Sequence, residues 1–402
     1  MDARAEALDE LAGTLRARLL DEAGGASGGA GLPDRIRALV DREAGVLAPA
    51  DRDELARILG ERAFGLGPLE ALLRDPAVDE VMVSGTRPVW VERHGRLERT
   101  SVAFAADGEL RHAIERILAP LGRRVDEAEP LCDARLPDGS RVNVVIPPLA
   151  VDGPALTIRR FRQRGLGPEE LVALGTWTPR LREILEAAVQ ARLNVLVSGG
   201  TGSGKTTTLN ALSAFVPDGE RVVTIEDTAE LRLRQPHVVR LEARPANVEG
   251  RGEVGIRRLL RNALRMRPDR IVVGEVRGPE ALEMLAAMTT GHDGSLSTVH
   301  ASSPAEALRR VETLALMADV GLPHAAVREQ AAGALDLIVH QARLPGGERR
   351  VVAVAEVVRV AGGPAVRELF SLRDGRETWH APRGEAVAER LSAVLPDGVS
   401  CA

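Results

Sequence analysis

The chain has 402 residues, a formal net charge of −5 at pH 7, and 44% hydrophobic and 28% charged side chains. This composition predicts two or three folded domains and gives no sign of a large basic surface for nucleic acid. With two cysteines, no apolar run of about 18 residues and no signal peptide, the sequence excludes a disulfide framework and a cysteine zinc site, and we expect a cytoplasmic protein without a membrane span.

Residues 1–62 are predicted to form a helical extension. Leucines at positions 8, 11, 15 and 19 are spaced as on one amphipathic helix. The glycine-rich stretch 24–31 is expected to be a flexible linker. Apolar residues from 34 to 75 again recur at helical intervals, and Asp51 or Asp53 is a suitable cap for the middle helix.

Residues 63–162 have the pattern of a small α+β domain. One helix is expected at 109–120, and strands are expected at 81–83, 89–91, 142–146 and 155–158. An interdomain linker is predicted at 163–171, around the Gly-Leu-Gly-Pro of residues 165–168.

Residues 172–402 alternate between helical and buried-strand patterns. Strands are expected at 194–198, 221–225, 270–274 and 350–360, with helices at 181–191 and from Lys205 onward. This alternation predicts an α/β fold with a mostly parallel sheet covered by helices.

The segment Gly199–Thr206 matches the phosphate-binding pattern G-x-x-x-x-G-K-[ST], with a strand before it and a helix after it. Backbone N–H groups and the helix N-terminus would hold the phosphates of ATP, with Lys205 on the β- and γ-phosphates and Thr206 on Mg²⁺. The predicted nucleotide-binding residues are Gly200, Thr201, Gly202, Ser203, Gly204, Lys205, Thr206 and Thr207.

Lys205 is the single lysine among 53 Lys and Arg residues. Arginine replaces lysine easily on a surface, but the compact ammonium group fits between phosphate oxygens better than the wide guanidinium does. The survival of one lysine inside the glycine loop therefore favours a phosphate-binding role.

Two predicted strands end in carboxylates, at Glu226-Asp227 and at Glu275. Parallel strands deliver such residues to one edge of a sheet, where they would order the attacking water or hold Mg²⁺. Each could instead be a solvated strand end. We assign Glu275 to the water and leave Glu226 and Asp227 as candidates for catalysis and Mg²⁺.

His292 and His300 lie eight residues apart in a segment of small residues. A neutral imidazole in such a segment can hydrogen-bond a phosphate or a carboxylate. The spacing alone favours two buried structural histidines, and no acidic or cysteine partner at ligand spacing supports a metal pair.

These motifs together resemble the traffic ATPases of type II and type IV secretion systems, over about residues 65–340. Within that superfamily the chain looks most like the CpaF/TadA-like ATPases of tight-adherence (Flp) pili. The resemblance rests on an aspartate box, a Walker B segment and a histidine box, at residues 224–231 (TIEDTAEL), 270–278 (RIVVGEVRG) and 291–301 (GHDGSLSTVHA). Residues 135–143 and 258–270 also look like family segments.

The resemblance implies a RecA-like motor domain, a smaller N-terminal α+β (PAS-like) domain and a homohexameric ring that binds ATP and Mg²⁺ between subunits. It implies roles in catalysis for His292 and His300, and arginine fingers from the smaller domain. The matching arginines are Arg135 and Arg141, with Arg159 and Arg160 near the hinge. The ring would power pilus assembly, pilus retraction or secretion, bound peripherally to platform proteins at the inner face of the cytoplasmic membrane.

Three alternatives remain open from the sequence. A conjugation-type traffic ATPase of a type IV secretion channel differs little in its motifs. A RecA-like nucleic-acid motor needs stacking aromatics, and the chain has five Phe, three Trp and no Tyr. A nucleotide-binding regulator would lack the hydrolytic carboxylates. The four-cysteine metal subdomain of many type II and pilus-extension ATPases is missing, which weighs against those subfamilies.

Overall fold

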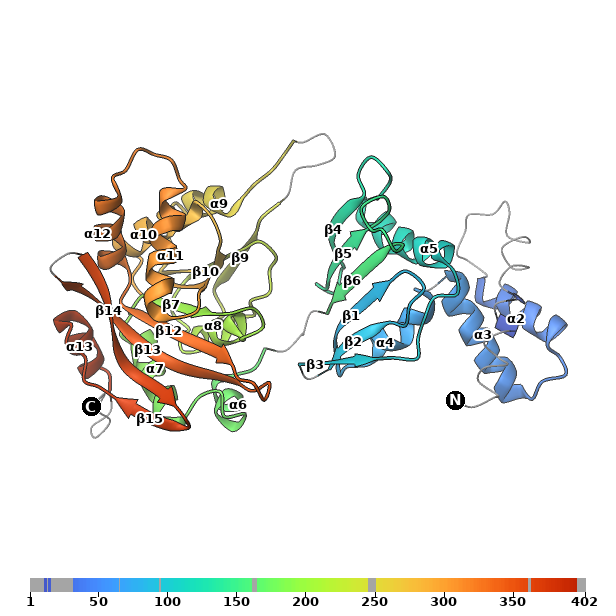
Figure 1. Cartoon of the computed structure of the whole chain (residues 1–402), viewed down its shortest axis with the longest axis horizontal. Helices are drawn as coiled ribbons and strands as arrows, with labels where there is room; N and C mark the ends of the chain where they lie inside the picture. Colours follow the sequence, from blue (N-terminus) through green and yellow to red (C-terminus); the bar gives the residue numbers. More distant parts are fainter. Residues whose placement is uncertain are drawn as a thin grey trace. The chain divides into compact units, whose positions relative to one another are not determined.

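The computed structural model describes residues 11–12, 14–15, 32–64, 66–93, 95–160, 165–244, 251–360 and 363–395 (Figure 1). It divides into two compact units, Met1–Arg162 and Gln163–Ala402. The predicted linker at 24–31 and most of the first predicted helix lie outside the described residues.

Helices α2 (Leu32–Glu43) and α3 (Pro49–Phe64) come before the first sheet. They bury Leu39 and Val40 against Leu55 and Leu59 in a small core that also includes Ala12 and Leu15. A short 3-10 turn, η1 (Gly67–Leu69), and helix α4 (Glu70–Arg74) then lead into the sheet.

The rest of the first unit is a six-stranded sheet with strand order β3-β2-β1-β6-β5-β4, in which every pair is antiparallel. Its strands are β1 (Val78–Ser84), β2 (Trp90–Arg93), β3 (Arg96–Arg99), β4 (Leu131–Arg135), β5 (Arg141–Val145) and β6 (Ala155–Arg159). Helix α5 (Asp107–Leu118) and the turn η2 (Ala119–Leu121) interrupt the strand sequence. Ile114 and Ile117 of α5 share a core with Val81 and Val83, the alternate inward residues of β1.

A nine-stranded sheet organises the second unit, with strand order β15-β14-β13-β12-β7-β11-β10-β8-β9. Its strands are β7 (Val195–Gly199), β8 (Val222–Glu226), β9 (Val238–Glu242), β10 (Arg270–Val276), β11 (Leu296–His300), β12 (Leu337–Arg343), β13 (Arg349–Val360), β14 (Gly363–Arg373) and β15 (Arg376–Trp379). The six strands from β12 to β9 run parallel, and β13, β14 and β15 continue the sheet in antiparallel pairs. The sequence patterns predict β7, β8, β10 and β13 but miss β9, β11, β12, β14 and β15.

Helices cover both faces of this sheet, as the α/β pattern requires (Figure 1). Two hydrophobic cores result, one that includes helices α7, α8 and α13 and one that includes helices α9 to α12. The helices are α6 (Pro168–Ala173), α7 (Pro179–Gln190), α8 (Lys205–Ser213), α9 (Ile256–Ala263), α10 (Glu280–Thr289), α11 (Pro304–Leu316), α12 (His324–Ala334) and α13 (Glu385–Ser392).

Helix α6 lies partly inside the segment predicted as an interdomain linker. Pro168 begins it, and the Glu170 carboxylate accepts a hydrogen bond of 2.7 Å from the Gly167 N–H. A proline at the first helical position and an acid three residues after the cap both favour a helix start, so the glycines here precede a helix.

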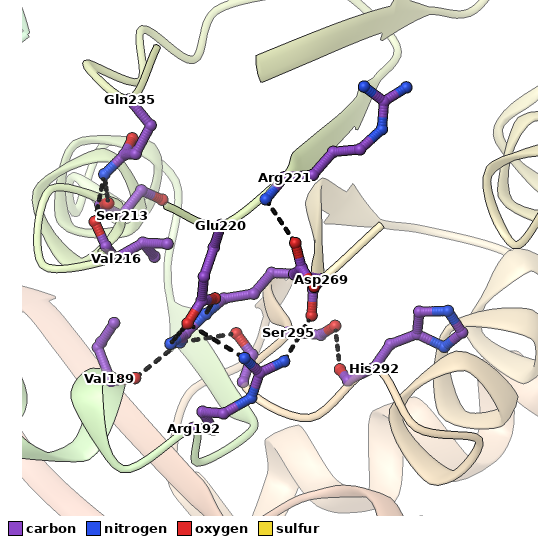
Figure 2. Close-up of polar contacts among 12 residues, drawn as sticks. Val189, Arg192, Ser213, Val216, Glu220, Arg221, Gln235, Asp269, His292 and Ser295 are labelled. Atoms are coloured by element: carbon purple, nitrogen blue, oxygen red, sulfur yellow. Dashed lines mark hydrogen bonds and ion pairs between the residues drawn. The ribbon is translucent and has the colours of Figure 1, made fainter. Parts of the chain in front are cut away.

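A buried polar network lies where the parallel strands begin (Figure 2). Arg270, at the start of β10, is 0% exposed and donates to Glu220 at 2.5 and 3.2 Å and to the Val189 carbonyl at 2.7 Å. The Arg192 guanidinium lies 3.1 Å from the same carboxylate. The charge of the buried Arg270 is thus compensated at the amino edge of the sheet. The glycine loop lies at the opposite, carboxyl edge.

Candidate functional site

The glycine loop follows β7 at the carboxyl edge of the parallel strands. Gly202 and Gly204 have φ angles of 68° and 96°, a region that glycine adopts without steric cost. A Cβ atom on Gly204 would also lie 2.9 Å from Nε2 of Gln341. Helix α8 begins at Lys205, so its N-terminal N–H groups face the loop as a phosphate site requires.

Lys205 is held inside the loop. Its Nζ donates to the Gly200 carbonyl at 3.1 Å and lies 3.3 Å from Nδ1 of His300. Burial lowers the pKa of Lys205, and the nearby Glu275 carboxylate opposes that shift. The ammonium group is therefore positioned beside both the loop and the candidate catalytic acid.

His300 connects the glycine loop to the end of β10. Its Nε2 lies 3.1 Å from Oγ1 of Thr201, and its Nδ1 lies 3.6 Å from Oε1 of Glu275. The other carboxylate oxygen of Glu275 accepts bonds of 2.9 and 2.6 Å from the Arg277 guanidinium. The structure thus brings together Lys205, Glu275 and His300, and it adds Arg277, which the sequence analysis did not single out.

Glu226, at the end of β8, is 3% exposed. Its Oε1 accepts 2.9 Å bonds from the N–H groups of Glu230 and Leu231, whereas Oε2 is buried and has no hydrogen-bond partner. Burial raises the pKa of this carboxyl group to about 7, despite the two backbone donors. An orphaned carboxylate oxygen of this kind is suited to a ligand that brings a proton donor or a cation.

Strand β12 pairs with β7 and packs against the glycine loop. Gln341 lies opposite Gly199 in the sheet, and a Cβ atom on Gly199 would lie 2.2 Å from the Gln341 carbonyl oxygen. The Gln341 side chain, 1% exposed, accepts a bond from Oγ1 of Thr208 on α8. The sequence analysis missed this residue because its partners lie more than a hundred positions earlier in the chain.

The remaining predicted nucleotide and metal residues fall at the same edge. Ser203 is buried and donates to the Gly200 carbonyl at 2.9 Å, while Thr206 and Thr207 are half-buried in the first turn of α8. Asp227 is exposed just beyond β8. Burial lowers the pKa of the Arg277 guanidinium, but its hydrogen bonds to Glu275 raise it above its usual value, and the nearby Asp227 carboxylate adds to that rise.

His292 lies at the other edge of the sheet. It precedes β11, whose five residues carry the chain across to His300, and its carbonyl accepts a 2.7 Å bond from Ser295 (Figure 2). Its ring Nδ1 lies 3.3 Å from the Ala287 carbonyl. Within one chain, His292 and His300 therefore belong to opposite edges, and the catalytic role of His292 stays a prediction.

The four candidate arginines of the first unit also separate into two kinds. Arg135, Arg141 and Arg159 are direct neighbours across β4, β5 and β6, so they form a row on one face of that sheet. Arg160 instead donates to the carbonyls of Asp75 and Val78, the latter at 3.2 Å. The row places three arginines side by side on one face, whereas the Arg160 contacts tie β6 to the start of β1.

Residues 62–351 match the protein family described as Type II/IV secretion system protein. The chain belongs to this family. A putative conjugal transfer protein of Mycobacterium tuberculosis H37Rv is 42% identical over 334 residues, which cover 82% of this chain and 92% of the relative. The type IV secretion system protein PtlH of Bordetella pertussis is 36% identical over 326 residues, covering 72% and 94%.

Two solved structures share the fold. The ATPase DotB of Yersinia pseudotuberculosis superposes with a TM-score of 0.53 at 18% identity, over 72% of this chain and 77% of that one. The pilus retraction motor PilT, solved with bound ADP, gives a TM-score of 0.50 at 20% identity, over 79% and 83%.

Membership in this secretion ATPase family makes the chain an ATP-hydrolysing enzyme with a mixed α/β motor fold. The superfamily predicted from the motifs is confirmed, and its CpaF/TadA-like branch stays a prediction. Among the described residues, none of the helices has the length and apolar character needed to cross a bilayer.

Proposed function

We propose that the chain hydrolyses ATP at the site formed by Gly199–Thr206, Glu226, Glu275 and His300, and that it drives a type IV secretion or pilus machine. The placement of Lys205 carries this proposal. Its Nζ lies within 3.3 Å of both the Gly200 carbonyl and Nδ1 of His300, and His300 in turn lies 3.6 Å from Glu275. A phosphate binder, a candidate base and a connecting imidazole thus share one sheet edge.

In the proposed reaction Glu275 orients the attacking water, and Lys205 with the loop N–H groups stabilises charge on the phosphates. His300 lies next to Thr201, Lys205 and Glu275, and we propose that its hydrogen bonds to them change when the γ-phosphate is present. Arg277 holds one oxygen of Glu275, so the carboxylate presents a fixed face to the water.

Mg²⁺ fits this site through oxygen ligands. The hydroxyl of Thr206, the orphaned Oε2 of Glu226 and Asp227 are the residues we propose to hold it, directly or through water. When bound, the ion supplies positive charge that neutralises the β- and γ-phosphate oxygens.

We further propose a homohexamer, peripheral to the membrane, in which the first unit of one subunit supplies arginines to the motor of its neighbour. The row of Arg135, Arg141 and Arg159 supports this, because three adjacent guanidinium groups suit a polyphosphate better than single surface charges do. The PAS-like nature of that unit belongs to the same proposal.

Two machines remain candidates, a tight-adherence pilus and a conjugation-type secretion channel. The sequence of the aspartate box favours the first, and similarity to conjugal transfer and type IV secretion proteins favours the second. Deleting the gene in its source organism distinguishes them, since surface pili disappear in one case and plasmid or effector transfer in the other.

The experiment for the site itself measures ATP hydrolysis and light-scattering mass for wild type, Lys205→Ala and Glu275→Gln. We expect a hexamer whose hydrolysis falls at least about a hundredfold in both variants. Glu275→Gln should still bind ATP, whereas Lys205→Ala should bind it poorly. A monomer that binds ATP without hydrolysing it, unaffected by Glu275→Gln, would leave the proposed mechanism without support.

A further inference from the structure

The hairpin that joins β12 to β13 stands beside the glycine loop. Gln341 of β12 is opposite Gly199, where β7 ends, so the last two residues of β12 continue past the point at which the loop begins. A turn at residues 344–348 closes the hairpin, with 2.8 Å bonds from Leu344 N–H to the Glu348 carbonyl and from Gly347 N–H to the Leu344 carbonyl. The hairpin is therefore a fixed structure beside the loop.

Arg343 and Arg349 are the two residues on either side of this turn, and both reach the same residue of the glycine loop. Nε of Arg349 donates a 2.9 Å bond to the Gly202 carbonyl. The guanidinium of Arg343 lies 3.8 Å from the place where a Cβ atom on Gly202 would be. One hydrogen bond and one close approach thus bring two guanidinium groups to Gly202.

The strand register makes this arrangement unusual. Arg343 and Arg349 are directly opposite each other across the hairpin, and like charges in that position normally destabilise a sheet. Both side chains are exposed, and arginine stays protonated throughout the physiological range. Two guanidinium groups held at neighbouring positions are suited to bind the oxygens of a polyphosphate.

We propose that Arg343 and Arg349 form a second phosphate-binding element, which contacts the polyphosphate chain of the nucleotide from within the same subunit. This inference rests on the proposed nucleotide site at Gly199–Thr206. The planar guanidinium presents several donors to phosphate oxygens, and Nε of Arg349 is already used to orient that group through Gly202. Lys205 and the loop N–H groups then bind one part of the polyphosphate and the arginine pair another.

Arg350 provides a matched control in the same hairpin. It is opposite Ala342 in the register, one residue along from the Arg343–Arg349 pair, so its side chain leaves the other face of the hairpin. Its guanidinium lies 3.9 Å from the Cβ position of Gly175, in the segment between α6 and α7. Replacing it removes the same charge without altering the face toward Gly202.

The test is isothermal titration of the full chain with ATP, ADP and AMP at about 50 and 500 mM salt. The variants are Arg343→Gln, Arg349→Gln, the double variant, Arg349→Lys, Arg350→Gln and Lys205→Ala, each first checked for an unchanged melting temperature. At low salt we expect each single glutamine variant to bind ATP roughly fivefold more weakly, and the double variant at least about twentyfold. The loss should shrink for AMP and at high salt, because it comes from charge.

The remaining variants decide the inference. Arg349→Lys keeps the charge but loses the Nε donor to Gly202, so it should recover only part of the ATP affinity, whereas Arg350→Gln should match wild type. If Arg343→Gln and Arg349→Gln also match wild type while Lys205→Ala loses binding, the arginine element is overturned and the nucleotide site stands. An equal loss for all three nucleotides at both salt concentrations would overturn it too, since that result indicates a contact that only shapes the loop. If Lys205→Ala binds ATP normally, the proposed site itself is wrong.

Discussion

Gly274 has no room for a side chain, because a Cβ atom there would lie 2.9 Å from Cγ of Glu226. Many P-loop enzymes place an aspartate at the position before the catalytic glutamate, and this chain has glycine. The carboxylate of Glu226 reaches that space from the neighbouring strand β8 instead, since β8 and β10 are paired in parallel. Glycine at position 274, in place of aspartate, thus leaves the space that the buried Glu226 side chain occupies.

A methyl group at position 274 should therefore displace the Glu226 side chain. We expect Gly274→Ala to lower the free energy of unfolding by about 1–3 kcal/mol, the usual cost of overpacking a well-filled site. Denaturant unfolding of Gly274→Ala, Glu226→Ala and the double variant measures it. The double variant should lose less stability than the sum of the single variants. Strict additivity would show that the two residues do not compete for space.

The raised pKa of Glu226 predicts a pH-dependent contribution to stability. Its pKa is about 7 in the folded chain because of burial, against 4.5 ordinarily, so the folded state binds the proton more tightly than the unfolded state. The resulting stabilisation is fully present below about pH 4.5 and is lost as the pH rises through 7. Relative to Glu226→Gln, wild type should thus lose up to about 3 kcal/mol over this range. Melting curves of both proteins at several pH values would contradict this if their difference stayed constant.

The two histidines of the histidine box should behave differently. His300 contacts the loop and lies near Glu275, whereas His292 lies at the other edge of the sheet. We expect His300→Ala to slow ATP hydrolysis at least about tenfold, because it removes a contact to both Thr201 and Lys205. His292→Ala should slow it less than about twofold in the isolated protein. Steady-state rates at saturating ATP decide this, and equal losses would favour a role for His292 in the site after all.

The buried ion pair at the amino edge should contribute to stability without affecting nucleotide binding. Glu220→Gln leaves the fully buried Arg270 guanidinium poorly compensated, which we expect to cost about 3–5 kcal/mol. Glu186→Gln breaks a more exposed pair with Arg182, at 2.8 Å, and should cost less than about 1 kcal/mol. Denaturant unfolding compares the two. A Glu220→Gln variant with weaker ATP affinity at unchanged stability would show that the two sheet edges are coupled.

Much of the site follows from local sequence. The glycine loop, the strand before it and the helix after it are all read from residues 194–213, because each depends on neighbours within a few positions. The carboxylates Glu226 and Glu275 are likewise predicted to meet at one edge, since parallel strands end together.

Contacts between distant segments could not be predicted in this way. The resemblance assigns His292 and His300 to one histidine box, but strand β11 carries the chain from one edge of the sheet to the other before it ends at His300. Gln341, Arg343 and Arg349 have no local pattern that points to a phosphate site. Their role depends on β12 pairing with β7, and that pairing joins residues about 140 positions apart.

The support that β12 gives to the glycine loop has a consequence for how the protein is made. Gln341 lies against Gly199 and accepts a bond from Thr208, 133 residues earlier in the chain. A nascent chain that has emerged from the ribosome only to α12 already contains the whole glycine-loop motif but lacks the strand beneath it. Nucleotide would therefore meet a competent pocket only late in translation, and a premature stop before residue 337 would yield a motif without its binding site.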